Sequence, residues 1–128
     1  MSRITTYRTA RTRQNRLKYG NRKCTLDGIS FDSVKEMNRY CELKYLLRAG
    51  EIKDLEVHKP FELQPGFRNK DGKYIRPITY EADFVYTDTE TDKQIIEDVK
   101  SKATANDAIY KLKKKMMMYK GLYIEEIK

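Results

Sequence analysis

Two strand-like runs separated by a short polar segment constrain the fold of this chain more than any other feature. Residues 78–86 and 94–100 are both rich in β-branched and aromatic residues, and residues 87–93 between them are polar throughout. A polar segment of this length between two such runs is typical of a turn. The pattern therefore predicts a long antiparallel hairpin, with its turn centred on Glu90 and Thr91.

This hairpin would gather charged side chains on one of its faces. A turn at that position places Asp83 directly opposite Asp98, with Cβ atoms roughly 5 Å apart. Because side chains alternate along a strand, Lys100 shares the face of Asp98, whereas Glu97 and Val99 point to the other side. Opposed carboxylates repel each other, and a hard cation with oxygen ligands would remove that cost. The spacing predicts a metal site, with an exposed network of ion pairs as the alternative.

A third carboxylate is predicted to lie on a helix. Ser33 and Glu36 have the spacing of a capping box, which would open a helix that runs to about residue 49 and ends at Gly50. Glu36 is the only charged member of a helical stripe that also contains Tyr40, Leu43 and Leu47. An acid at the end of a core-facing stripe would point along the sheet. Closure of the capping box explains the same residue equally well.

The chain before the long hairpin predicts shorter elements. Asp27-Gly28 is a strong signal for a two-residue turn, so residues 22–31 predict a small hairpin. Residues 52–57 and 61–64 predict two short strands, which Pro60 would interrupt.

Residues 69–73 predict a loop, and the C-terminal part of the chain predicts a second helix that ends before Gly121, followed by a strand over residues 122–127. The predicted apolar stripe of this helix consists of Ile109, Leu112, Met116 and Tyr119. Lysines occupy much of the remaining surface, which is typical of a solvated helix face and could also extend a DNA-binding surface.

Length and composition indicate one domain of a globular protein. The chain has 128 residues, of which 39% are hydrophobic and 36% are charged. No apolar run approaches the roughly 20 residues that span a bilayer, and the N-terminus lacks the apolar stretch of a secretory signal. We therefore expect a cytoplasmic protein with no membrane partner. The one histidine, His58, lies in a polar stretch and is assigned no role.

The N-terminal segment carries the whole net charge of +8. Residues 1–23 hold eight bases and no acid, so the other 19 of the 27 bases balance the 19 acids in the rest of the chain. This bias predicts a flexible basic arm, residues 1–22, that orders on a polyanion, with a solubilising tail as the alternative. The expected DNA-binding residues are Arg3, Arg8, Arg11, Arg13, Arg16, Lys18, Arg22, Lys23, Lys102 and Lys111.

These motifs, in this order, resemble the PD-(D/E)XK nuclease superfamily. Residues 28–33 with Glu36, the boundary at 49–52, and the segments 81–86 and 97–100 are similar to those of small phage and prophage endonucleases related to Holliday junction resolvases. The resemblance covers roughly residues 22–128 and leaves the arm outside it. It has two departures: Ala82 replaces the proline of the superfamily's name, and Asp98 stands where many relatives carry glutamate.

The resemblance implies an α/β, restriction-endonuclease-like fold over residues 23–128, with a central mixed β-sheet and helices on both sides. It implies a Mg²⁺-dependent DNA endonuclease, with Mn²⁺ expected to substitute and branched DNA, as met in phage recombination, as the expected substrate. Asp83, Asp98, the Val99 carbonyl and Glu36 would hold the metal, and Lys100 would orient the attacking water. Paired cuts across a symmetric junction would call for a homodimer. A catalytically silent DNA-binding or recombination accessory protein is the alternative.

Overall fold

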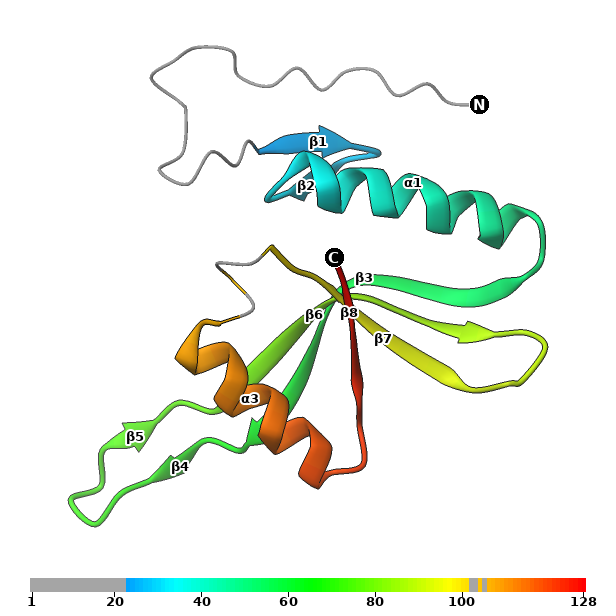
Figure 1. Cartoon of the computed structure of the whole chain (residues 1–128). Helices are drawn as coiled ribbons and strands as arrows, with labels where there is room; N and C mark the ends of the chain where they lie inside the picture. Colours follow the sequence, from blue (N-terminus) through cyan, green and yellow to red (C-terminus); the bar gives the residue numbers. More distant parts are fainter. Residues whose placement is uncertain (1–22, 102–103, 105) are drawn as a thin grey trace. The chain divides into compact units, whose positions relative to one another are not determined.

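The computed structural model describes residues 23–101, 104 and 106–128. The chain divides into two compact units, one ending at Arg48 and the other running from Ala49 to Lys128, and each is described by itself (Figure 1). The predicted basic arm, residues 1–22, lies outside the described residues.

The first unit contains a small hairpin and one helix. Strands β1 (Cys24–Leu26) and β2 (Ile29–Phe31) pair antiparallel. The turn between them consists of Asp27 and Gly28, with φ of 55° and 78°. A two-residue hairpin turn of this kind needs positive φ at both positions, which Asp-Gly adopts readily. The structure confirms the predicted hairpin. Helix α1 (Val34–Arg48) follows, also as predicted.

Helix α1 begins and ends at the residues that the sequence indicates. The Glu36 backbone N–H donates to the Ser33 hydroxyl at 3.1 Å, which satisfies one of the free donors of the first turn. Gly50, with φ of 81°, follows the helix in the left-handed conformation that commonly ends one. Tyr40 packs its ring against Phe31, with centroids 5.1 Å apart. Aromatic packing therefore joins the helix to its hairpin.

The second unit is built on a mixed four-stranded sheet in the order β3 (Ile52–Gln64), β6 (Ile78–Asp88), β7 (Gln94–Val99) and β8 (Ile124–Ile127). The β3–β6 and β6–β7 pairs are antiparallel, and β7–β8 is parallel. Parallel neighbours need a crossover connection, which α3 (Ala108–Tyr119) supplies. The predicted mixed sheet is confirmed. Within the described part of the chain, no helix has both the length and the apolar character needed to span a membrane.

The core of this unit lies between the sheet and α3. Residues from all four strands and from the helix form one buried cluster, which consists of Leu63, Tyr80, Ala82, Val85, Ile96, Tyr110, Met117 and Ile124. Contacts between apolar side chains that are remote in sequence hold the crossover helix on this face of the sheet.

The prediction that Pro60 interrupts the third strand region is wrong. Strand β3 is continuous over 13 residues, and Pro60 pairs with Glu81 within it. Strand β3 is one of the two edge strands of the sheet. A proline that lacks an N–H is tolerated there, because one side of an edge strand has no neighbour to receive a hydrogen bond.

The predicted apolar face of the second helix is wrong for three of its four residues. Met116 packs against the core, but Ile109, Leu112 and Tyr119 are exposed, whereas Tyr110 and Met117 are buried against the sheet. Lysines occupy the positions between these two buried residues on the same side, so the buried face has too few apolar residues to stand out as a stripe. A long lysine stem can cover apolar surface while its charged end reaches a polar partner, as the Lys114 ammonium reaches Glu126.

The predicted loop at residues 69–73 is the tip of a small hairpin. Strands β4 (Phe67–Arg68) and β5 (Tyr74–Ile75) pair antiparallel, and Figure 1 shows this hairpin extending beyond the ends of β3 and β6. Two-residue strands give too little periodicity to be recognised in a sequence.

Candidate metal centre

The hairpin of β6 and β7 has the register that the sequence predicts. Phe84 pairs with Glu97, and the following pairs keep the same register toward the turn. Extended by one residue away from the turn, the same register sets Asp83 opposite Asp98. The Asp83 carboxylate oxygen Oδ2 accepts a hydrogen bond from the Val99 backbone N–H at 2.8 Å. The carboxylate of Asp83 is therefore fixed at the end of β7, by the residue that follows Asp98.

Asp98 is held by two partners in a buried position. Its side chain forms an ion pair with Lys100, with Nζ 3.1 Å from Oδ1, and the Tyr80 hydroxyl donates to Oδ2. Asp98 is only 5% exposed, so its charge depends on these partners for stabilisation. The Lys100 ammonium also lies 3.7 Å from the centroid of the Tyr110 ring, a cation–π contact. The aspartate and the lysine are thus both positioned by tyrosines.

Burial and the charges of Asp83 and Asp98 raise the pKa of two tyrosines, Tyr80 and Tyr110. The pKa of Tyr80 lies above its ordinary value because its ring is buried and because the negative charges of Asp98 and Asp83 lie near it. Burial, the hydrogen bond to Glu126 and the same two aspartates raise the pKa of Tyr110. Both phenols therefore keep their protons and act as hydrogen-bond donors.

Glu97 has a different environment, as strand alternation predicts. It is buried and accepts a hydrogen bond from the Tyr86 hydroxyl, whereas Asp98 accepts one from Tyr80. The alternation of side chains along β7 thus separates Glu97 from Asp98 and Lys100.

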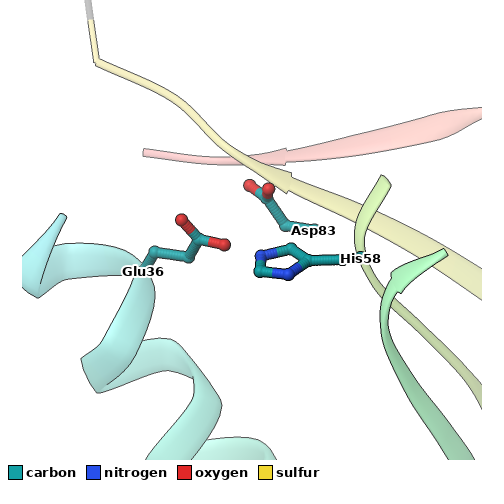
Figure 2. A group of neighbouring side chains, drawn as sticks. All are labelled: Glu36, His58 and Asp83. Carbon is teal, nitrogen blue, oxygen red and sulfur yellow. The ribbon is translucent and has the colours of Figure 1, made fainter. Parts of the chain in front are cut away.

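His58 is a site residue that sequence reasoning missed. It lies on β3 between Val57 and Lys59, which pair with Phe84 and Ala82, so His58 faces Asp83 across the strand pair. A ring nitrogen of His58 and a carboxylate oxygen of Asp83 lie within 4.8 Å of each other. Figure 2 shows the two side chains lying side by side. The sequence does not predict this pair. With a strand break expected at Pro60, it gives no register between β3 and β6 and so does not place His58 opposite Asp83.

The backbone around His58 and Asp83 departs from regular strand geometry. His58 has φ of 57°, a left-handed conformation that is uncommon outside glycine. On β6, Tyr80, Ala82 and Val85 all join the cluster under α3, although strict alternation would place residue 84 there. The alternation therefore changes phase next to Asp83. Irregularities of this kind re-aim side chains and are frequent at functional sites.

Glu36, which Figure 2 also labels, belongs to the first unit. Within that unit it is hydrogen-bonded to residues at the start of α1. Its side chain is buried, and Oε1 accepts the Asp32 backbone N–H at 3.2 Å. Together with the Ser33 hydroxyl, this completes a capping arrangement at the start of α1, displaced by one residue from the usual box. The capping role of Glu36 is therefore real, and its predicted role at a metal stays a prediction.

Only two of the predicted DNA-binding bases lie among the described residues. Lys23 is exposed and forms a 3.5 Å ion pair with Asp32, and Lys111 is exposed on α3. The others lie outside the described residues: Arg3, Arg8, Arg11, Arg13, Arg16, Lys18, Arg22 and Lys102.

The donor set on the sheet suits a divalent cation. The carboxylates of Asp83 and Asp98 offer the oxygen ligands that Mg²⁺ and Mn²⁺ prefer, and the imidazole of His58 adds a nitrogen ligand that transition metals also accept. The ammonium of Lys100 lies beside Asp98 and would face a phosphate drawn to such an ion. Asp83 and His58 lie close enough to contact one cation, and the Asp98–Lys100 pair lies next to the Val99 N–H that holds Asp83.

Comparison with known proteins gives a family but no characterised relative. No curated protein and no solved structure matches the chain. The family match leaves out the first 15 residues, most of the predicted arm, and includes every residue of the candidate centre. The chain belongs to the family described as "Protein of unknown function (DUF1064)", whose model matches residues 16–128.

Proposed function

We propose that this protein is a Mg²⁺-dependent DNA endonuclease of the PD-(D/E)XK type, with a restriction-endonuclease-like fold. One observation carries the proposal: Asp83 is bonded to the backbone of Val99 beside the buried Asp98–Lys100 pair. Two carboxylates and an ammonium group thus meet where the middle of β6 runs beside the end of β7. That set is costly to assemble in a buried position unless a ligand compensates the charges.

Asp83 and Asp98 hold the ion in this proposal, with the Val99 carbonyl as a further oxygen ligand and Glu36 as the third carboxylate. A bound Mg²⁺ would supply an acidified water and offset the negative charge that develops on the phosphate. Lys100 orients the attacking water and faces the phosphate as a compact positive charge.

Three neighbours keep the reactive groups in place. The Tyr80 hydroxyl fixes one oxygen of Asp98, which leaves the orientation of that carboxylate independent of the ion. The Tyr110 ring supports the Lys100 ammonium. His58 brings an imidazole nitrogen near Asp83, which favours Mn²⁺ as a substitute for Mg²⁺.

The substrate in this proposal is DNA, with a branched molecule such as a four-way junction as the expected form and phage recombination in the host cytoplasm as the setting. The bases of the arm bring the phosphate backbone to the acids. Symmetric cutting of a junction would use two copies of the chain.

A catalytically silent DNA-binding protein is the second candidate, because the Asp98–Lys100 ion pair balances its own charge without a metal. Incubation with supercoiled plasmid, a four-way junction and single-stranded DNA, each with Mg²⁺ or EDTA, separates the two. Cleavage that requires Mg²⁺ supports the nuclease, and binding without cleavage supports the silent protein.

A further inference from the structure

The β4–β5 hairpin carries an unusual surface for so small an element. Phe67 and Tyr74 are 45% and 52% exposed, although large aromatic rings are usually buried. Residues 67–76 also contain four bases and a single acid, Asp71. The bases are Arg68, Lys70, Lys73 and Arg76. Aromatic rings interleaved with positive charges suit a ligand that has both flat apolar faces and negative charge.

The tip of the hairpin is ordered by its own hydrogen bonds. The backbone N–H of Asn69 donates to the carbonyl of Lys73 at 2.9 Å, and the N–H of Gly72 donates back to the carbonyl of Asn69 at 2.9 Å. The Asn69 side chain accepts from the N–H groups of Asp71 and Lys73. Arg68 donates to the carbonyl of Gly72 at 2.9 Å. The exposed rings therefore stand on a preformed support, which lowers the entropy lost on binding.

The ring of Tyr74 lies in a defined place because of Gly66. A methyl group on Gly66 would overlap the Tyr74 hydroxyl, so only glycine allows the ring to lie so close to the backbone at this point. The guanidinium of Arg68 lies 5.7 Å from the centre of the same ring. The ring is thus supported by glycine backbone and flanked by a cation.

We propose that this hairpin is a binding platform for unpaired DNA nucleotides. The register pairs Tyr74 with Arg68 and Phe67 with Ile75, so the two rings lie on opposite faces of the hairpin. Each ring stacks on a nucleobase, and the four basic side chains of the hairpin contact the phosphates on either side. Base faces are accessible to such rings in single strands and at branches, whereas in duplex DNA they are covered by neighbouring base pairs. The platform rests on the proposed function in taking DNA as the polymer, and it gives the nuclease a physical means to prefer branched molecules.

A single tryptophan provides the most direct test. The protein contains no tryptophan, so Tyr74→Trp introduces one reporter ring at the platform. Titration with oligo(dT) in EDTA should quench its fluorescence saturably, and added salt should weaken the quenching. The matched control is Tyr123→Trp, which replaces a tyrosine that is 67% exposed outside the hairpin and should not be quenched. Equal quenching of both reporters, or of neither, would overturn the platform.

Substitutions of the rings give the expected size of the effect. Tyr74→Ala and Phe67→Ala should each weaken binding of oligo(dT) by about 5- to 150-fold, which corresponds to the stacking energy of one base. Tyr74→Phe keeps the ring and should bind as the original protein does. Gly66→Ala should weaken binding because its methyl group displaces Tyr74. Unchanged binding in both alanine variants of the rings would contradict the proposal.

The binding test does not depend on the nuclease. It uses EDTA, and Asp83→Asn can be added to remove the predicted metal site. Quenching without any Mg²⁺-dependent cleavage would retain the platform and reject the endonuclease. Cleavage of junctions with unquenched Tyr74→Trp would do the reverse.

Discussion

The carboxylate of Asp83 accepts a hydrogen bond from the backbone N–H of Val99 at 2.8 Å. This bond ties the middle of β6 to the end of β7, where Asp98 and the following Lys100 form an ion pair through their side chains. Asp83 is therefore positioned by backbone geometry, which is more rigid than contact with a long side chain. The proposed metal centre depends on this relationship.

The two buried tyrosine–carboxylate bonds make a matched pair for testing the site. Tyr80→Phe removes the donor to Asp98, and Tyr86→Phe removes the donor to Glu97. Each should lower the free energy of unfolding by about 1–3 kcal/mol, because a buried carboxylate loses one of its hydrogen-bond donors. Urea unfolding measures this. Only Tyr80→Phe should also slow Mg²⁺-dependent cleavage, and an equal loss of cleavage in both variants would argue against a special role for Asp98.

Glu126 should make the stability of the second unit depend on pH. Hydrogen bonds from Lys114 and Tyr110 lower the pKa of Glu126 to about 2 from an ordinary value of 4.5. A lowered carboxyl pKa stabilises the fold above the ordinary value and loses this effect as the pH falls from 4.5 toward 2. In Glu126→Gln, urea unfolding should show lower stability than the original protein at pH 7 and a smaller difference at pH 3. A difference that grows toward pH 3 would contradict the assignment.

The sequence predicts those features of the structure that depend on neighbouring residues, such as turns, helix ends and strand alternation. The register of the β6–β7 hairpin follows from alternation and a short turn, and the bounds of α1 follow from Ser33 and Gly50. The continuity of β3 through Pro60 was missed because it depends on that strand lying at the edge of the sheet. The left-handed backbone of His58, which faces Asp83, has no local signature.

The buried face of α3 was missed for a related reason. The helix buries Tyr110 and Met117, while the lysines between them mask the period in the sequence. Lys114 reaches Glu126 at 2.8 Å, a contact that becomes predictable only when the crossover to β8 is known. Tertiary partners decided which side of this helix faces the core.

His58 should influence which metal binds. His58→Asn removes the imidazole and keeps a side chain that tolerates a positive φ, so the fold should be retained. Affinity for Mn²⁺ should fall by about tenfold or more, since loss of even an outer-shell metal partner typically costs 10- to 100-fold. Affinity for Mg²⁺ should fall less, because Mg²⁺ prefers oxygen ligands. Calorimetric titration with each ion measures both, and unchanged Mn²⁺ affinity would remove His58 from the site.

A bound divalent ion should stabilise the protein through its acids. Mg²⁺ at a hundredfold excess over its dissociation constant should add about 2.7 kcal/mol to the free energy of unfolding. Asp83→Asn should lose this stabilisation. Glu81→Gln, an exposed position on the same strand, should keep it. Thermal unfolding with Mg²⁺ or EDTA gives the comparison, and equal shifts in the two variants would place the ion elsewhere.

Cleavage of a four-way junction by Asp83→Asn tests the central claim most directly. The amide oxygen of asparagine can still accept the Val99 N–H, so the variant should fold and bind DNA while it lacks the charge that holds the ion. We predict that the original protein and Glu81→Gln cut the junction in Mg²⁺ and not in EDTA, and that Asp83→Asn shows no cleavage under either condition. Cleavage by Asp83→Asn at the original rate, or by the original protein in EDTA, would contradict the account.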